Sequence, residues 1–201
     1  MRVVAGSAGG IPLTIPKNVE LRPTMDMVKG AIFSSLSDFI VDARVLDLFS
    51  GTGALGIEAL SRGAVSAVLV EKERKATASI EANLQKTGLS ATVQQMDVFS
   101  YLDRLAAPGS FEVIFADPPY AKETGDRDFT KELLASESLR RALAPGGIFV
   151  LEHLPGAKLP LRDGWNCFRQ KRYGATEVAF LRLHDAGSTQ EEAEKAEEPA
   201  S

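Results

Sequence analysis

The sequence predicts an α/β protein with one mostly parallel sheet and helices on both of its faces. The first observation is that short apolar runs alternate with helical patterns between residues 44 and 151, because strands separated by helices form parallel βαβ units. The second is a glycine-rich loop directly after the first of these runs, where open α/β sheets bind ligands. The third is length, since 201 residues with 44% hydrophobic content fit one domain with a continuous core.

Residues 1–14 contain two short apolar runs around a glycine-rich stretch, which predicts a small hairpin. Apolar residues at helical spacing then predict a helix over residues 24–39, with Thr24 as its N-cap. We therefore assign residues 1–23 to an appendage of hairpin and loop, and residues 24–184 to the main domain.

Nine elements make up the alternation that follows. Strands are expected at 44–48, 66–70, 92–96, 112–116 and 147–151, and helices at 54–61, 74–85, 99–105 and 131–143. Two further strands, 166–172 and 177–183, are joined by a turn around Gly174 that is too short for a crossover helix. They are expected to form an antiparallel hairpin at the end of the sheet.

Residues 185–201 carry the excess of negative charge. The whole chain has a formal net charge of −4, and this segment, with six acidic residues and one lysine, accounts for −5, which leaves +1 for residues 1–184. The segment is poor in large apolar residues and rich in Ala and Glu, so we expect a disordered acidic tail. Such a tail serves solubility, or competes with phosphate for a basic face of the body.

The low cysteine content and the lack of a long apolar run indicate the compartment of the protein and whether it binds a metal. Cys167 is the single cysteine, so we expect neither an intramolecular disulfide nor a cysteine-based metal cluster. Charged residues interrupt the apolar residues near the N-terminus, and no apolar run approaches the length of about 20 residues that spans a bilayer. These observations predict a soluble cytoplasmic protein without a metal.

The glycine-rich loop, Asp47-Leu-Phe-Ser-Gly-Thr-Gly-Ala-Leu-Gly56, leaves the first strand and enters its helix. Its glycines let a ligand approach the backbone. Glu71 lies at the end of the second strand, where a carboxylate can accept hydrogen bonds from both hydroxyls of a ribose. The pattern fits a nicotinamide dinucleotide as well as S-adenosylmethionine. Glycines used only for close packing of strand and helix would give the same pattern.

Three features favour S-adenosylmethionine. Asp47 lies upstream of the glycines, where it would repel a pyrophosphate but attract the α-ammonium of a methionine moiety. Asp97 closes the third strand and offers a carboxylate to an adenine amino group. No length remains for the separate substrate domain that a nicotinamide enzyme usually needs. Alternatively, Glu71 is an exposed strand end and Asp97 is a helix N-cap. The predicted cofactor site comprises Asp47, Ser50, Gly51, Gly53, Glu71, Asp97, Val98 and Asp117.

The tetrapeptide Asp117-Pro118-Pro119-Tyr120 follows the fourth strand and is expected to carry the chemistry. Two prolines remove two N–H donors, so the loop offers mainly acceptors, namely the Asp117 carboxylate and the Pro118 carbonyl. Two acceptors that bind the hydrogens of an aromatic amine would direct its lone pair at a methyl donor. Tyr120 offers a flat face on which a base can stack. A plain proline turn with a rim aromatic is the alternative interpretation.

These motifs together resemble the class I S-adenosylmethionine-dependent methyltransferases, in their amino-methylating branch. The segments 2–6, 21–26 (Leu-Arg-Pro-Thr-Met-Asp) and 45–60 resemble more closely the RsmD family, and the similarity extends from Arg2 to about Leu183. The resemblance implies a Rossmann-like, seven-stranded sheet with one antiparallel strand. It also implies methylation of a guanine N2 amine in bacterial 16S rRNA. The cofactor would be bound by Asp47, Gly51, Gly53, Glu71 and Asp97, and the target amine by Asp117, Pro118 and Tyr120.

Contacts with the RNA are expected from residues around this pocket. Arg22 and Thr24 would lie near the methionine end of the cofactor or the RNA backbone, unless they are a surface arginine and a helix cap. Pro119 and Tyr120 would contact the target base. The basic residues expected along the RNA are Arg2, Lys17, Arg22, Lys29, Lys122, Arg127 and Lys131. Arg169, Lys171 and Arg172 are expected instead to limit pairing at an edge strand.

A body that is close to neutral favours a substrate already shaped by other components, such as a partly assembled small ribosomal subunit bound by a monomer. Three other functions fit part of the sequence. One is methylation of adenine N6 or cytosine N4 in RNA or DNA, and another is a nicotinamide-dependent oxidoreductase. The last is an assembly factor without catalytic activity.

Overall fold

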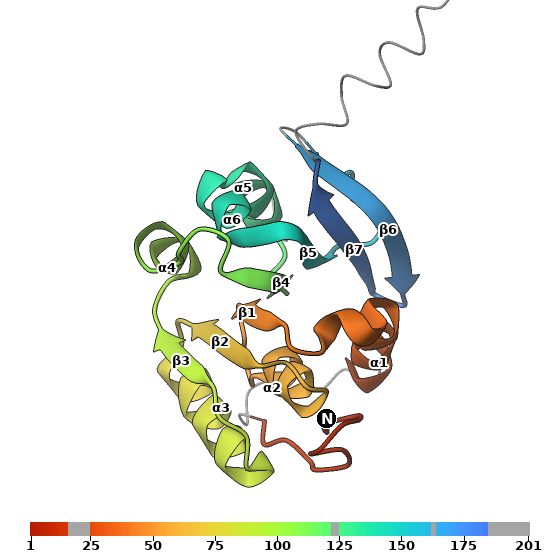
Figure 1. Ribbon diagram of the computed structural model, residues 1–201. Helices are drawn as coiled ribbons and strands as arrows, with labels where there is room; N and C mark the ends of the chain where they lie inside the picture. Colours follow the sequence, from red (N-terminus) through yellow and green to blue (C-terminus); the bar gives the residue numbers. More distant parts are fainter. Residues whose placement is uncertain (16–24, 122–124, 162–163, 185–201) are drawn as a thin grey trace, which may run out of the picture.

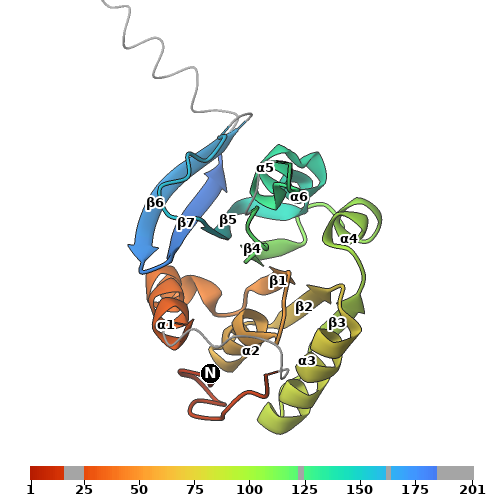
Figure 2. The ribbon, with the colours of Figure 1, turned by 180° about the vertical axis from the view of Figure 1, so that it is seen from behind.

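A computed structural model describes residues 1–15, 25–121, 125–161 and 164–184 of the chain. Figures 1 and 2 show a twisted sheet with helices on both faces. Several predictions lie outside the described residues. They are the roles of Lys17, Arg22, Thr24 and Lys122, and the acidic tail at 185–201.

Seven strands form one sheet in the order β3-β2-β1-β4-β5-β7-β6. Their bounds are β1 Arg44–Leu48, β2 Ser66–Glu71, β3 Thr92–Gln95, β4 Phe111–Ala116, β5 Leu143–His153, β6 Trp165–Tyr173 and β7 Thr176–Leu183. Strands β1 to β5 pair in parallel, whereas β7 runs antiparallel to both of its neighbours, β5 and β6. The predicted Rossmann-like sheet with one antiparallel strand is confirmed, and so is the final hairpin.

The helices are α1 Met25–Leu36, the 3-10 helix η1 Ser37–Ile40, α2 Ala54–Ser61, α3 Arg74–Thr87, α4 Val98–Arg104, α5 Phe129–Ala135 and α6 Glu137–Ala142. Alternate residues of β1 separate two apolar clusters, because strand side chains point to opposite faces. Val45 packs with α1, α2 and α3, whereas Leu46 and Leu48 pack with α4, α5 and α6. The two helical layers in Figure 1 correspond to these clusters. Among the described helices, none has both the length and the apolar character needed to cross a membrane.

The single helix expected at 131–143 is wrong, because Ser136 divides the segment into α5 and α6. Ser136 has an extended backbone (φ −70°, ψ 115°), and its hydroxyl accepts a hydrogen bond from the Leu139 N–H. Serine competes for backbone groups in this way and therefore favours caps over helix interiors. Strand β5 also begins at Leu143, earlier than expected, and its register with β4 shifts between Phe111 and Val113.

Residues 1–14 fold back on themselves and lie against α2. The two apolar runs pair through one isolated bridge between Arg2 and Pro12, and Val3 and Leu13 join the apolar cluster of α1, α2 and α3. Gly6 has φ +86°, and a Cβ at this position would lie 1.8 Å from the Ser61 carbonyl oxygen. The hairpin is therefore packed tightly on the C-terminal turn of α2.

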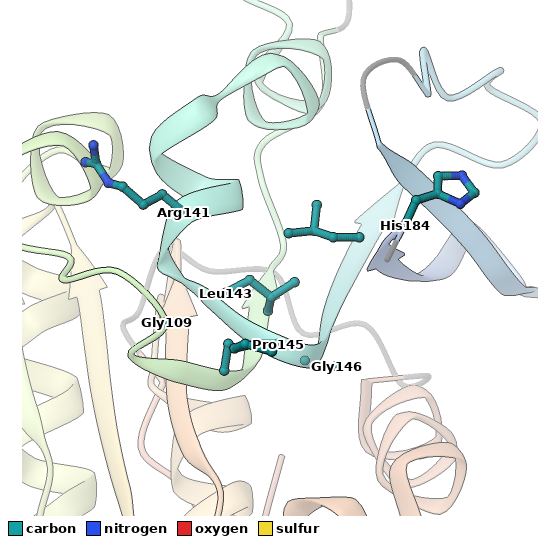
Figure 3. A pocket seen from close by; sticks show the side chains of 9 residues that line it. Gly109, Arg141, Leu143, Pro145, Gly146 and His184 are labelled. Atoms are coloured by element: carbon teal, nitrogen blue, oxygen red, sulfur yellow. The ribbon is translucent and has the colours of Figure 1, made fainter. Parts of the chain in front are cut away.

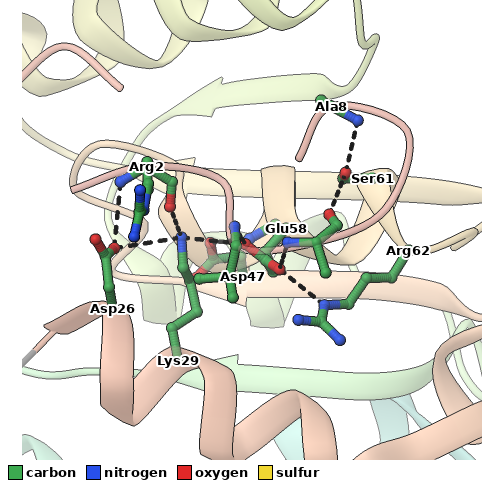
Figure 4. A network of polar contacts seen from close by, with 11 residues as sticks. Arg2, Ala8, Asp26, Lys29, Asp47, Glu58, Ser61 and Arg62 are labelled. Atoms are coloured by element: carbon green, nitrogen blue, oxygen red, sulfur yellow. Dashed lines mark hydrogen bonds and ion pairs between the residues drawn. The ribbon is translucent and has the colours of Figure 1, made fainter. Parts of the chain in front are cut away.

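Glu58 of α2 anchors this packing from inside the protein (Figure 4). Its fully buried carboxylate accepts hydrogen bonds from the Val4 and Ala5 amides at 2.7 and 3.0 Å. It also pairs with Lys29 Nζ at 3.2 Å and with Arg62 Nε at 2.7 Å. The prediction that Lys29 faces RNA is wrong, because its side chain is buried against this carboxylate and donates to the Arg2 carbonyl.

Candidate active site

The predicted acids meet at the carboxyl edge of the parallel strands. Asp47 is the penultimate residue of β1, Glu71 is the last residue of β2, and Asp117 follows β4 directly. Because β1 lies between β2 and β4, these three residues come from adjacent strands. No three or more His, Cys, Asp and Glu side chains in the described part of the chain are arranged to hold a metal ion.

Asp47 is a buried carboxyl group with little compensation for its charge. The residue is 2% exposed, and Oδ2 accepts a hydrogen bond from the Gly56 N–H at 2.9 Å. Burial raises the pKa of this carboxyl to about 7, the Gly56 bond opposes the rise, and the negative charges of Asp117 and Glu71 add to it. A cationic group bound at this edge would therefore stabilise the ionised form of Asp47.

Gly51 and Gly53, the two loop glycines in the predicted cofactor site, differ in their surroundings. Gly53 has φ +78°, and a Cβ there would lie 2.9 Å from Leu69 Cδ2 and 3.2 Å from Ile57 Cδ1. Gly51 has φ +56°, and the nearest atom to an added Cβ is the Phe49 carbonyl oxygen at 4.0 Å. Close packing therefore explains Gly53, whereas Gly51 leaves the space beside it for a ligand.

Ser50 and Glu71 hold the loop in shape. The Ser50 hydroxyl donates to the carbonyl oxygen of Asp47 at 2.6 Å, and its N–H donates to the carbonyl of Val70 at 3.1 Å. The Glu71 carboxylate accepts from the N–H of Gly51 at 2.8 Å and from that of Glu73 at 2.8 Å. Each carboxylate oxygen has a second lone pair, so these bonds still allow Glu71 to accept from hydroxyl groups of a ligand.

Asp97 is the N-cap of α4, as the alternative interpretation expected. Its Oδ1 accepts hydrogen bonds from the amides of Phe99 and Ser100 at 3.0 and 3.1 Å, and Val98 behind it is buried. This role is compatible with a contact to an adenine amino group, because the two oxygens together provide about four acceptor positions. The contact itself stays a prediction.

The tetrapeptide presents its residues unevenly to solvent. Asp117 and Pro119 are exposed, Tyr120 is half-buried and Pro118 is buried. The Tyr120 hydroxyl lies 2.8 Å from Thr176 Oγ1 at the start of β7. Thr176 in turn donates to Glu152 Oε2 on β5 at 3.2 Å. Sequence reasoning missed Thr176 and Glu152, because the predicted hairpin did not indicate that Thr176 meets Tyr120.

An aromatic cluster borders the same edge. The Arg127 guanidinium lies over the rings of Phe99 and Phe129, at 4.9 and 4.7 Å from their centroids. Arg127 also forms hydrogen bonds with Glu132, and this interaction raises the pKa of the guanidinium. Phe49, which follows β1 with φ 58°, packs edge-on against Phe129. The charge of Arg127 is thus already paired within the protein.

The basic residues for which the sequence predicted a role fall into four groups. Arg2, Arg127 and Lys131 are exposed, as contact with RNA would require. Arg169, Lys171 and Arg172 are exposed on β6, which confirms their expected place on an edge strand. Lys29 is buried, and the other predicted contacts fall outside the described residues.

A hollow of about 370 Å³ lies at the opposite edge of the sheet (Figure 3). It is lined by Gly109 before β4, by Arg141 of α6, by residues at the start of β5, and by His184 after β7. These positions belong to the amino-terminal edge of the parallel strands, and none of the predicted site residues lines the hollow. Because ligands of open α/β sheets bind at the carboxyl edge, this hollow is not the candidate site.

Comparison with known proteins adds sequence relatives. Residues 1–182 match the family model described as conserved hypothetical protein 95. Ribosomal RNA small subunit methyltransferase D of Escherichia coli strain K12 is 39% identical over 186 residues, which cover 90% of this chain and 87% of that protein. The Haemophilus influenzae protein of the same name is 30% identical over 177 residues, with 87% and 89% covered.

Solved structures share the whole architecture. The Escherichia coli protein yhhF superimposes with a TM-score of 0.77 at 28% identity, covering 92% of this chain and 98% of the other. A hypothetical protein of Thermus thermophilus, TTHA0928, gives a TM-score of 0.73 at 29% identity, with 92% and 99% covered. The likeness therefore extends over almost the full length of both solved chains.

Proposed function

The chain belongs to the RsmD family, which the conserved hypothetical protein 95 model describes, and on that premise we propose that it methylates the exocyclic N2 amine of a guanine in 16S rRNA. The methyl donor is S-adenosylmethionine. The observation that carries this proposal is the position of Asp117. It follows β4 beside the buried Asp47 of β1, so the acceptor for a target amine lies next to the group suited to a cationic cofactor.

The residues at the carboxyl edge fit this cofactor. The buried Asp47 carboxyl, whose pKa is raised to about 7, suits the α-ammonium group, and the open space beside Gly51 allows close approach to the backbone. Glu71 would accept from the ribose hydroxyls, and Asp97 with Val98 would border the adenine. When bound, S-adenosylmethionine supplies an electrophilic methyl group on a sulfonium.

The tetrapeptide would hold the target amine. The Asp117 carboxylate and the Pro118 carbonyl accept hydrogen bonds from the two amine hydrogens, which directs the nitrogen lone pair towards the methyl group. Pro119 has no N–H that could compete for these acceptors. Tyr120 stacks on the base, an interaction worth roughly 1 to 3 kcal/mol for a splayed-out base.

The substrate is proposed to be rRNA within a partly assembled small subunit. The net charge of +1 on residues 1–184 provides little attraction for naked RNA, so recognition would depend on the shape of the particle. Exposed Arg2 and Lys131, together with the predicted contacts of Arg22, Thr24 and Lys122, would supply local phosphate contacts. We propose that the protein acts as a cytoplasmic monomer, without a metal, with residues 1–23 and 185–201 flanking the catalytic domain.

Mass spectrometry of nucleosides from 16S rRNA tests this proposal in cells. Deleting the gene is expected to remove one N2-methylguanosine, which the wild-type gene restores and a gene for Asp117→Ala at equal protein level does not. Unchanged N2-methylguanosine would refute the target. A loss of methylated adenine or cytosine would favour the alternative bases, and calorimetric binding of NADH but not S-adenosylmethionine would favour the oxidoreductase.

A further inference from the structure

We propose that Thr176 and Glu152 are positioning residues of the target-base site, which hold the ring of Tyr120 in the place where the base stacks. This inference rests on the proposed function, because it assumes that Tyr120 stacks on the target base. It gives residues of two strands, β5 and β7, a role in substrate binding. Neither residue follows from the motifs in the sequence.

The direction of the hydrogen bonds is fixed by the donors available. Thr176 has one hydroxyl proton, which it donates to Glu152 Oε2 at 3.2 Å. The Tyr120 hydroxyl must then donate its own proton to Thr176 Oγ1, at 2.8 Å. Two hydrogen bonds in series therefore connect Tyr120 through Thr176 to the Glu152 carboxylate, and each bond strengthens the other.

The anchor is rigid because it belongs to the sheet. Thr176 is 6% exposed and is the first residue of β7, where it pairs with Tyr173 of β6. Its β-branched side chain has little rotational freedom. Glu152 lies on β5, opposite Val178 of β7. Two paired strands thus fix the position of the hydroxyl that Tyr120 contacts.

The contact between the Tyr120 hydroxyl and Thr176 restricts the movement of the Tyr120 ring. The Tyr120 side chain is fixed at its backbone end by the proline-rich loop and at its far end by Thr176. Its ring can then only pivot about the axis that joins the two ends. Since less freedom is lost when a base stacks on a ring that is already held, the anchor should strengthen binding of the RNA substrate.

Four variants test the inference with small subunits from cells that lack the protein as substrate. Thr176→Val and Tyr120→Phe each remove one hydroxyl of this series, and each is expected to raise the KM for the subunits by about 3- to 10-fold. The double variant should be no worse than either single one, because both break the same interaction. Thr176→Ser keeps the hydroxyl and should restore most of the affinity.

A matched control separates positioning from folding. Thr87→Val removes a hydroxyl that donates to Asn83 and Leu84 carbonyls at the end of α3, and it should leave the KM unchanged. All variants should bind S-adenosylmethionine within about twofold of wild type. An unchanged KM in Thr176→Val and Tyr120→Phe, additive effects in the double variant, or no rescue by Thr176→Ser would overturn the inference. If the wild-type protein itself formed no N2-methylguanosine, the proposed function would fail instead.

Discussion

Two buried carboxyl groups on consecutive elements of this protein, Asp47 and Glu58, differ in the partners that compensate their charge. Glu58 of α2 is fully buried and is surrounded by two backbone amides, Lys29 and Arg62. Asp47 of β1 is 2% exposed, and among the described residues its carboxylate accepts from the Gly56 amide and pairs with no cation. The negative charges of two more acids, Asp117 and Glu71, add to the rise in the pKa of Asp47 that its burial causes.

The difference distinguishes a structural acid from an acid prepared for a ligand. A buried carboxylate that has its full set of partners fixes packing, here of the N-terminal hairpin on α2. A buried carboxylate without a cation is costly, and such groups concentrate at functional sites. In our account, the cation that Asp47 lacks is the ammonium group of the cofactor.

Removing Asp117 should have the largest effect on activity. Asp117→Ala deletes the proposed acceptor for the target amine, so turnover should fall by roughly 100- to 1,000-fold or more. The same change removes one of the two charges that raise the pKa of Asp47, so the carboxyl group of Asp47 ionises more easily. Affinity for S-adenosylmethionine should therefore stay within a few fold. Single-turnover kinetics and calorimetry measure the two effects. Strong residual turnover would exclude Asp117 from the reaction.

Changing Glu58 should affect stability and leave the cofactor site intact. Glu58→Gln removes the carboxylate 3.2 Å from the buried Lys29 Nζ and leaves that ammonium only the more distant Asp26, at 4.0 Å, which should lower the free energy of unfolding by about 3 kcal/mol. Denaturant titration measures the loss, and calorimetry at a temperature where the variant is folded should give wild-type affinity for the cofactor. A large loss of affinity without a loss of stability would reverse our assignment of the two acids.

Changing Asp47 should give the opposite pattern. Asp47→Asn should weaken binding of S-adenosylmethionine by roughly 10- to 100-fold, because it removes the charge that we propose pairs with the ammonium group of the cofactor. At pH 7.5 the free protein should be no less stable than wild type, since the variant removes an uncompensated buried charge. Equal destabilisation in Asp47→Asn and Glu58→Gln would show that both acids are structural.

The pH dependence gives the smallest but most specific signal. Because the pKa of Asp47 is raised to about 7 in the folded protein, its contribution to stability is fully present below about pH 4 and is lost as the pH rises through 7. Affinity for the cofactor should change in the other direction and increase by at most about tenfold per pH unit up to pH 7. Titrations from pH 5.5 to 7.5 test this, and Asp47→Asn should show neither trend.

The sequence predicted the sheet and the placement of the site because both depend on local patterns. Alternating apolar runs mark the strands, and the order of strand ends brings Asp47, Glu71 and Asp117 to one edge. The break at Ser136 was missed since helical spacing of apolar residues continues across it, while a single side-chain hydrogen bond decides the backbone there.

Contacts between distant segments could not be predicted in the same way. Lys29 has the helical spacing of the buried residues Ile32 and Phe33, but a lysine is rarely buried without a partner. Its partner Glu58 lies on another helix, so the burial of the pair depends on tertiary packing. Thr176 and Glu152 meet Tyr120 because β7 returns beside β5, and neither residue type marks a site on its own.

Methyl transfer in a purified system tests the central claim most directly. Small subunits from cells that lack the protein are incubated with the enzyme and S-adenosylmethionine carrying an isotopically labelled methyl group. We predict that the label is recovered as N2-methylguanosine in 16S rRNA with the wild-type protein, and that Asp47→Asn at limiting cofactor and Asp117→Ala transfer little or none. Label recovered on adenine or cytosine, or no label with the wild-type protein, would contradict the account.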